Sequence, residues 1–378
     1  MGDGKYTTLV EALAEVPDPR KARGQRYPWI LLLTLVSAAL VSGNPNGRAI
    51  GQWVEEHADE LAQELDRAGR PLPSESTLRR ALRGVDVAEL EERIKRFTDA
   101  PREPKPETTW EGVAVDGKEV RGARAHGRVV HLVAAVRHDG VVLAETAVAN
   151  KSNEITAAPR LLHGLDLHGK VVTVDALLAQ RNLARQIRQQ GGHYLMVIKE
   201  DQPETYSAIK LLFDEPPEGK SAAETTVRTI SKGHGRREWR TLETSSALKG
   251  WLNWPDHEQV CRRTCRRLIL KTGELEEETT YAVTSMPKAE ASAALLEGFW
   301  RGHWTIENQV HYPRDVTFHE DQGQAYRGST PQALAALRNA FLSLLRSLGW
   351  INIADALRHC AAKVRNALQL IGALPRRL

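Results

Sequence analysis

The chain has 378 residues, enough for about two or three domains of ordinary size. Fifty-two Lys and Arg residues against 48 Asp and Glu residues give a net charge of +4, which is too balanced for a protein that coats DNA by charge alone. Hydrophobic residues make up 41% and charged residues 26%, which excludes wholesale disorder. Three cysteines cannot build a disulfide framework and are typical of a protein of the reducing cytoplasm.

Residues 1–99 have a helical pattern and are expected to form an N-terminal domain. Their longest apolar run, Trp29 to Val41, has 13 residues, fewer than the ~20 that span a bilayer, and therefore predicts a buried helix. A later basic helix, beyond a turn with two prolines, carries Arg79, Arg80 and Arg83. This order is compatible with helix-turn-helix DNA binding, and the alternative is a bundle with a solvated arginine face.

A proline-rich linker at 100–109 precedes a change of pattern. Strands are expected at 111–116, 128–136, 140–148, 170–175 and 193–199, with helices before and after the fourth. The order β-β-β-α-β-α-β is the layout of a ribonuclease H-like core, a mixed sheet with helices on its faces. The sequence therefore predicts an α/β fold whose first core part is 110–200.

The rest of the chain is expected to interrupt and then complete this core. Residues 201–288 predict a β-rich insertion with two basic clusters. Helical pattern returns at 289–348, and 349–378 predict a basic helical tail. Residues 322–378 carry eight Lys or Arg residues and one acid, Asp355, so this part has a charge of +7. Such an excess indicates an anionic partner, for example nucleic acid.

Two aspartates follow apolar, β-branched runs: Asp116 in "VAVDGK" and Asp175 in "VTVDAL". The strands that carry them are neighbours in a β-β-β-α-β core, so the carboxylates meet at one end of the sheet. A divalent cation relieves the repulsion between such carboxylates. The alternatives are a turn at Asp116–Gly117 and a helix cap at Asp175.

A third acid is expected from a later helix. In "FWRGHWTIENQVHYPRD", Trp300, Glu307 and Arg314 are seven residues apart and would share one face of an α-helix. Pro313 is expected to end this helix, which leaves the place of Arg314 open. The rival acids are Asp315, Glu320 and Asp321, and Glu307 is preferred because His, Trp and Asn flank it on an otherwise apolar helix.

The chain resembles the DDE transposases of bacterial insertion sequences, and within them the ISAs group with the H-repeat-associated proteins. The resemblance covers almost the whole chain. It rests on "VPDPRKARGQRYP" (Val16 to Pro28), "AVDGKEVRG" (Ala114 to Gly122), "KSNEI" (Lys151 to Ile155), "VTVDALLAQRNLA" (Val172 to Ala184), "GGHYLMVIKEDQP" (Gly191 to Pro203), "GHGRRE" (Gly233 to Glu238), "HWTIENQVHYPRDVTFHED" (His303 to Asp321) and "LRNAFLSLLR" (Leu337 to Arg346).

By this resemblance Asp116, Asp175 and Glu307 match the Asp-Asp-Glu positions. It implies a ribonuclease H-like fold with a β-rich insertion before the Glu helix. It also implies two Mg²⁺ or Mn²⁺ ions, with Asp116 bridging them, and cleavage and strand transfer at the terminal inverted repeats of an element. The implied partners are double-stranded DNA, as element ends and target, and further copies of the chain in a homodimer or higher oligomer.

The chain departs from the wider superfamily pattern Tyr, two residues, Arg, three residues, Glu, six residues, Lys. It has Trp300 and His303 before Glu307 and Arg314 after it. His303 is a weaker phosphate anchor than Arg, and Arg301 is its expected substitute. Leu178 and Ala179 stand where relatives often have His and Thr.

DNA contacts are expected from three parts of the chain, with surface charge or core packing as the alternative for each residue. They are Lys118, Arg121, Arg301, His303, Trp304 and Arg314 near the acids, Arg236, Arg237, Arg262, Arg263, Arg266 and Arg267 in the insertion, and Arg79, Arg80 and Arg83 in the N-terminal domain. Two further functions stay open: a nuclease of the same fold that cuts without joining, and a decayed or domesticated relative that binds DNA without catalysis.

Overall fold

The computed structural model describes residues 6–23, 25–98, 110–125, 128–148, 154–216, 221–233 and 235–375. The predicted linker at 100–109 lies outside these residues. The chain divides into two compact units. The first unit consists of Met1–Pro104, Gly117–Asn153 and Ile306–Leu378, and the second unit of Lys105–Asp116 and Glu154–Thr305.

Six helices open the described part of the first unit. They are α1 (Leu9–Ala14), α2 (Trp29–Val41), α3 (Gly47–Glu56), α4 (Ala58–Glu64), α5 (Glu75–Gly84) and α6 (Val87–Thr98). The helix α2 occupies the apolar run read from the sequence, and all of its residues except Ile30 are buried. No helix in the described ranges combines the length and the apolar character needed to cross a bilayer.

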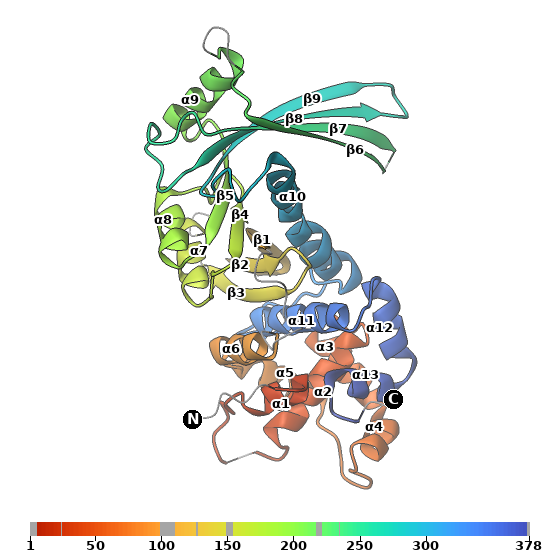
Figure 1. Cartoon of the computed structure of the whole chain (residues 1–378). Helices are drawn as coiled ribbons and strands as arrows, with labels where there is room; N and C mark the ends of the chain where they lie inside the picture. The colour runs from red at the N-terminus through yellow and green to blue at the C-terminus, as the bar shows by residue number, and fades with distance from the viewer. Residues whose placement is uncertain are drawn as a thin grey trace. The chain divides into compact units, whose positions relative to one another are not determined.

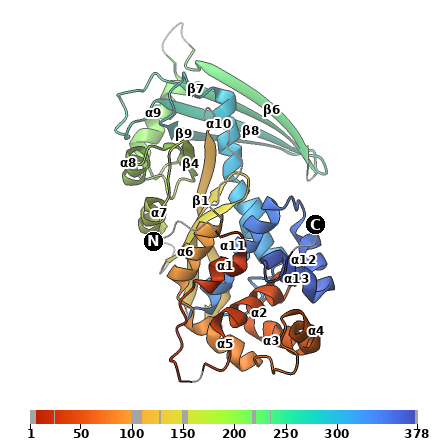
Figure 2. The same cartoon turned by 60° about the horizontal axis from the view of Figure 1, so that its bottom comes forward.

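Three helices from the end of the chain belong to the same unit: α11 (Thr330–Ser347), α12 (Ile353–Ala362) and α13 (Val364–Ile371). Their apolar faces pack against the N-terminal helices, α13 and α12 on α2 and α11 on α5 and α6 (Figures 1 and 2). The two ends of the chain therefore share one core.

The first unit also contains a β-hairpin of β2 (Arg128–Arg137) and β3 (Val142–Val148). Its turn contains Gly140, whose φ of +84° lies in the region that favours glycine. Leu132 of β2 buries its side chain together with Ala335 of α11 and with Val120 and Ala123 of the preceding strand, β1 (Glu111–Ala125).

The strand β1 (Glu111–Ala125) contributes to both units. The sequence predicted that it ends at Asp116, but it continues through Asp116–Gly117, so there is no turn at that position. Hydrogen bonding between strands runs in the order β3-β2-β1-β4-β5-β9-β8-β7-β6. The mixed α/β class and the large sheet are therefore confirmed.

In the second unit, the beginning of β1 pairs in parallel with β4 (Lys170–Val174), and β4 pairs in parallel with β5 (His193–Ile198). β4 and β5 are short and almost wholly buried, as parallel strands usually are. The helices α7 (Glu154–His163) and α8 (Arg181–Gln189) precede and follow β4.

The insertion begins with a helix, α9 (Pro203–Asp214), that the sequence analysis did not identify. Four antiparallel strands follow: β6 (Thr225–Gly233), β7 (Arg236–Ser245), β8 (Gln259–Ile269) and β9 (Leu275–Thr284). The last of them pairs with β5, which joins the insertion to the sheet of the second unit. β6 is the free edge in the strand order.

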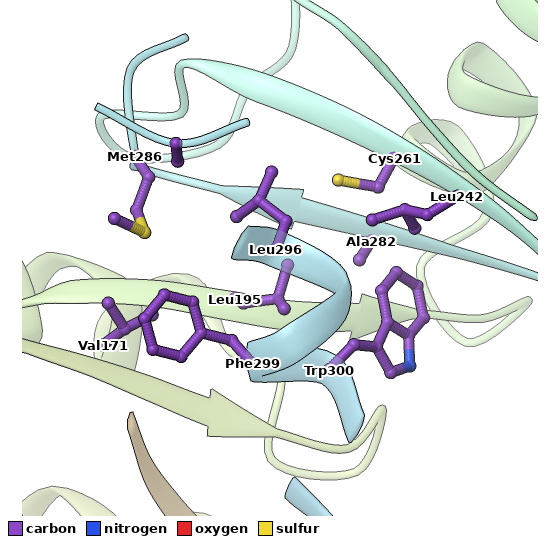
Figure 3. Close-up of a cluster of buried hydrophobic side chains, with 10 residues drawn as sticks. Val171, Leu195, Leu242, Cys261, Ala282, Met286, Leu296, Phe299 and Trp300 are labelled. Atoms are coloured by element: carbon purple, nitrogen blue, oxygen red, sulfur yellow. The ribbon is translucent and has the colours of Figure 1, made fainter. Parts of the chain in front are cut away.

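The helix α10 (Ala293–His303) covers one face of this sheet. Leu296, Phe299 and Trp300 of the helix pack against Leu242 of β7 and Cys261 of β8 (Figure 3). On β8 the neighbouring Arg262 lies against Phe213 of α9, so α9 covers the opposite face.

Candidate active site

Two of the predicted acids follow paired strands at the same end of the sheet in the second unit. The last paired residues of β1 and β4 are Val115 and Val174, and Asp116 and Asp175 come directly after them. Asp175 is exposed, and its carboxylate accepts a hydrogen bond of 3.5 Å from the backbone N–H of Leu178. It does not cap α8, which begins at Arg181. Two carboxylates at neighbouring strand ends are a donor set that fits a hard divalent cation.

The end of α10 supplies further predicted residues in this unit. His303 places Nδ1 3.2 Å from the hydroxyl of Thr173, which ties it to β4 two residues before Asp175. Trp300 is buried in the hydrophobic core of this unit. Trp304 is 59% exposed, and Arg301 is exposed as well.

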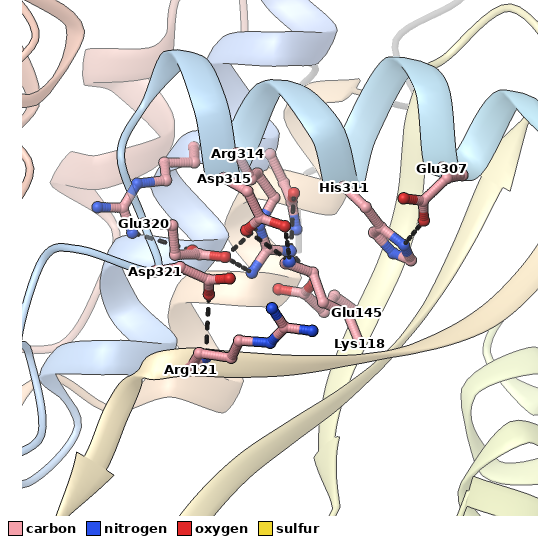
Figure 4. A network of polar contacts seen from close by, with 11 residues as sticks. Lys118, Arg121, Glu145, Glu307, His311, Arg314, Asp315, Glu320 and Asp321 are labelled. Carbon is pink, nitrogen blue, oxygen red and sulfur yellow. Dashed lines mark hydrogen bonds and ion pairs between the residues drawn. The ribbon is translucent and has the colours of Figure 1, made fainter.

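The third predicted acid, Glu307, belongs to the first unit and begins the π-helix η2 (Glu307–His311). Its side chain is 53% exposed, and its carboxylate lies 3.2 Å from Nδ1 of His311 (Figure 4). The hydrogen bond from His311 outweighs partial burial and lowers the pKa of Glu307, and Lys118 lowers it further. The carboxylate is therefore held in its ionised form.

The sequence predicted that the helix ends at Pro313, but the helical segment continues beyond this residue. A second π-helix, η3 (Pro313–Thr317), follows η2, and both have i→i−5 hydrogen bonds at their ends. Pro313 has no N–H for the carbonyl of Gln309, and the guanidinium of Arg346 donates to that carbonyl instead. The wider turns accommodate the proline within the helical segment.

The prediction that Trp300, Glu307 and Arg314 share one face assumed α-helical geometry. It does not hold in these wider turns. Glu307 is exposed, whereas Arg314 is fully buried. The guanidinium of Arg314 bonds to the carboxylates of Glu145 on β3 and Glu320 (Figure 4). The expectation that Arg314 contacts DNA is corrected on this ground, because buried carboxylates engage its donors.

This buried network extends to α11. Arg338 donates to Glu320 at 3.0 Å and to the backbone carbonyl of Pro45 at 2.7 Å. Burial raises the pKa of Glu320, but Arg314 and Arg338 outweigh that effect and leave its pKa below the ordinary value. Ion pairs thus connect β3, η3, α11 and the loop that carries Glu320.

Two cations predicted near the acids also have partners in the first unit. Lys118 is buried, and its ammonium lies 2.6 Å from both carboxylate oxygens of Asp315 (Figure 4). The backbone N–H of Arg121 donates to the carboxylate of Asp321 at 2.9 Å, and Arg121 itself is exposed. Lys118 therefore anchors β1 to η3 and has no surface charge left for phosphate in this conformation.

The three acids that rival Glu307 as the third metal ligand all have partners in the structure. Asp315 pairs with Lys118, Glu320 with two arginines, and Asp321 with the backbone of β1. In this acid-rich stretch, Glu307 is the one whose residue is exposed. The sequence analysis missed the structural roles of Asp315 and Asp321 because their partners lie 197 and 200 positions away in the chain.

The arginines of the insertion are mostly paired across strands. Arg262 bonds to Glu243 at 2.8 Å, Arg266 to Glu277 at 2.5 Å and Arg267 to Glu278 at 2.8 Å, whereas Arg236 pairs with Glu238 on its own strand at 2.5 Å. The half-buried Arg263 pairs with the buried Glu297 of α10 at 2.9 Å. Arg237 instead lies over the ring of Trp239 at 5.9 Å. The basic clusters are thus largely neutralised, which the sequence could not indicate without the strand register.

The basic helix of the N-terminal part is α5. Its Arg79 pairs with Glu75 at 2.9 Å and rests on Gly47, where a Cβ would come within 2.8 Å of the Arg79 side chain. Arg80 is exposed and Arg83 is half-buried. The helix therefore packs closely on α3 and exposes part of its charge.

Comparisons with known proteins find two family models that match the chain. Residues 108–341 match the family model described as "Transposase DDE domain", and residues 10–98 match the one described as "DDE_Tnp_1-associated". The chain is 28% identical to "H repeat-associated putative transposase YhhI" of Escherichia coli K12 over 89% of this chain and 90% of that protein. It is also 28% identical to "Putative protein YbfL" of the same strain, with the same coverage.

A solved structure is also similar. The chain matches a piggyBac transposase in a synaptic complex with hairpin DNA at a TM-score of 0.44 and 7% identity, over 97% of this chain and 78% of that one.

Proposed function

The chain belongs to the transposase DDE domain family, and from this premise we propose that it cleaves and joins DNA at the terminal inverted repeats of an insertion sequence. The family model spans Asp116, Asp175 and Glu307. The observation that carries the proposal is the register of β1 and β4, in which Asp116 and Asp175 follow paired residues at one end of the sheet.

We assign Asp116, Asp175 and Glu307 as the residues that hold the divalent metal, Mg²⁺ or Mn²⁺, that the family generally uses. Their carboxylate oxygens are the ligands such hard cations prefer. When two such ions are bound, they lower the pKa of the attacking water and stabilise the leaving oxygen of an in-line displacement.

The remaining groups position these acids. His311 keeps Glu307 ionised and oriented through its 3.2 Å hydrogen bond. The network of Arg314, Glu145 and Glu320 holds the helical segment that carries Glu307 against β3. His303 supports β4 beside Asp175 through Thr173.

The proposed partner is double-stranded DNA, bound by a dimer or higher oligomer of the chain. Arg79, Arg80 and Arg83 of α5 are proposed to read the element ends. Arg301 and Trp304, both exposed, are proposed to contact DNA near the cut, with Trp304 stacking on an unpaired base.

The test is Asp116→Asn, which keeps the shape of the side chain and removes a ligand charge. Mg²⁺-dependent nicking of terminal-repeat DNA should fall about 10³-fold or more, because the metal supplies several kcal/mol of transition-state stabilisation. DNA binding should persist. Asp166→Asn is the matched control, since Asp166 lies before the opposite end of β4 and is exposed.

Three outcomes separate the candidate functions. Joining of pre-cut 3′-OH ends to target DNA supports a transposase, whereas cutting without joining indicates a nuclease. DNA retention without any metal-dependent nicking indicates a relative that only binds. Near wild-type nicking by Asp116→Asn would refute the assignment of the ligand.

A further inference from the structure

The side chains of Glu307 and His311 lie side by side on η2, four residues apart in the first unit. Nδ1 of His311 is 3.2 Å from Oε2 of Glu307, and Figure 4 shows the ring and the carboxylate turned toward each other. Two ligands that bind an octahedral cation at about 2.1 Å, and at right angles to each other, lie about 3.0 Å apart. The two atoms are therefore spaced as neighbouring ligands of one metal ion.

His311 is held in place by the folded unit. Its side chain is 5% exposed, whereas that of Glu307 is 53% exposed. Arg346 donates to the backbone carbonyls of Gln309 and Gly140 and fixes η2 against the turn between β2 and β3. An ion at this pair would thus have a rigid nitrogen ligand on its buried side and open coordination positions beside the exposed carboxylate.

The charges near this pair allow a cation to bind. The ammonium of Lys118 is close enough to lower the pKa of Glu307, so it would also oppose a metal ion there. Asp315, however, holds this ammonium 2.6 Å from both of its carboxylate oxygens. This ion pair offsets the charge of Lys118 and leaves the ionised carboxylate of Glu307 to attract the metal.

An imidazole ligand discriminates between metal ions. Mg²⁺ prefers oxygen ligands and gives up water reluctantly, whereas the first-row transition-metal ions, of which Mn²⁺ binds most weakly, accept imidazole nitrogen. A neutral imidazole binds through the nitrogen that carries no proton, so Nδ1 would bind the ion and Nε2 would keep the proton.

We propose that His311 is a nitrogen ligand of the metal held by Glu307, and that this site therefore selects a transition-metal ion such as Mn²⁺ over Mg²⁺. The inference rests on the proposed function and deepens it, because the three acids Asp116, Asp175 and Glu307 supply oxygen ligands alone.

The test detects the bound nitrogen directly, in the full-length chain without DNA. Mn²⁺ is added at less than one ion per chain, and pulsed electron paramagnetic resonance records the modulation from nitrogen bound to the ion. The wild type should show the modulation of a directly bound imidazole, and isotopic labelling of histidine nitrogen alone should change its frequencies. A wild-type spectrum without this modulation, or one that the labelling leaves unchanged, would overturn the proposal.

Two variants assign the signal to one histidine. His311→Gln should lose it, while Glu307 and the other proposed carboxylates still bind Mn²⁺. His303→Gln is the matched control and should keep it, because His303 is a half-buried histidine of the second unit whose Nδ1 lies 3.2 Å from the hydroxyl of Thr173. A signal that His311→Gln retains would refute the assignment, whichever histidine supplies it.

A competition titration separates a metal ligand from a residue that only orients Glu307. In His311→Gln the Mn²⁺ affinity should fall about 10-fold or more, since even the outer partners of metal ligands are worth ~10–100-fold. The Mg²⁺ affinity should change much less, and equal losses for both ions would show that His311 only orients the carboxylate.

Nicking of terminal-repeat DNA is scored separately. Nicking by a wild type that lacks the nitrogen signal overturns this inference alone, whereas the nitrogen signal without any nicking overturns the proposed function alone.

Discussion

Arginine and glutamate pair in both units, but in opposite surroundings. In the first unit Arg314 is fully buried between Glu145 and Glu320 (Figure 4). In the second unit, Arg266 reaches Glu277 on the surface of the sheet, with side chains 60% and 49% exposed. A buried pair cannot lose one partner without leaving an uncompensated charge, whereas water replaces a lost surface partner at little cost. The first arrangement therefore holds the fold, whereas the second contributes little to it.

The largest effect is expected where the buried network is broken. Arg314→Met leaves Glu145 and Glu320 without their main partner and should lower the free energy of unfolding by ~3–5 kcal/mol. Arg266→Met, the matched change on the surface, should cost ~0–1 kcal/mol. Urea unfolding of both variants measures the difference, and equal losses would contradict the comparison.

An intermediate effect is expected for Lys118, whose partner Asp315 has a side chain that is 30% exposed. Lys118→Met should lower the free energy of unfolding by ~1.5–3 kcal/mol, the range for hydrogen bonds to charged groups. In a double-mutant cycle, Asp315→Asn should add little to the loss caused by Lys118→Met. Fully additive losses would show that the pair does not act as a unit.

A pH effect sharpens the comparison. Although burial alone raises the pKa of Glu320, its arginine partners bring it below the ordinary value. Ionised Glu320 therefore contributes stability above its unfolded pKa, and this contribution is lost as the pH falls through the folded pKa. Between pH 7 and pH 3 the unfolding free energy of Glu320→Gln should fall less steeply than that of the wild type. Glu277→Gln on the sheet surface should keep the wild-type slope.

The smallest effect on stability is expected for changes at exposed cations of the sheet in the second unit. These changes should instead alter the salt dependence of DNA binding. Arg228 and Lys232 of β6 and Arg237 of β7 are exposed, and no ion pair engages them within the described ranges. Their triple Ala variant should reduce the slope of log affinity against log salt by up to ~0.9 for each DNA phosphate that the variant no longer neutralises. Ala at the paired Arg266 and Arg267 should change the slope less, because Glu277 and Glu278 already neutralise them. Equal slopes for both variants would contradict this distinction.

Residues near one another in the chain carried most of what the sequence alone determined. The apolar run at Trp29–Val41 became α2, and the β-branched runs before Asp116 and Asp175 became paired strands. Such features depend on local periodicity and on motifs of adjacent residues, which a sequence displays directly.

Only the tertiary structure decided which charges are paired and where the Glu307 segment continues. Arg314 meets Glu145 across 169 positions of sequence, and the arginines of β8 are neutralised by a strand register that their own sequence does not contain. Pro313 is tolerated because Arg346, 37 positions from Gln309, supplies the missing hydrogen-bond donor. Partners that are distant in the chain meet only when the core has packed, so burial, and with it the role of each arginine, is a property of the folded unit.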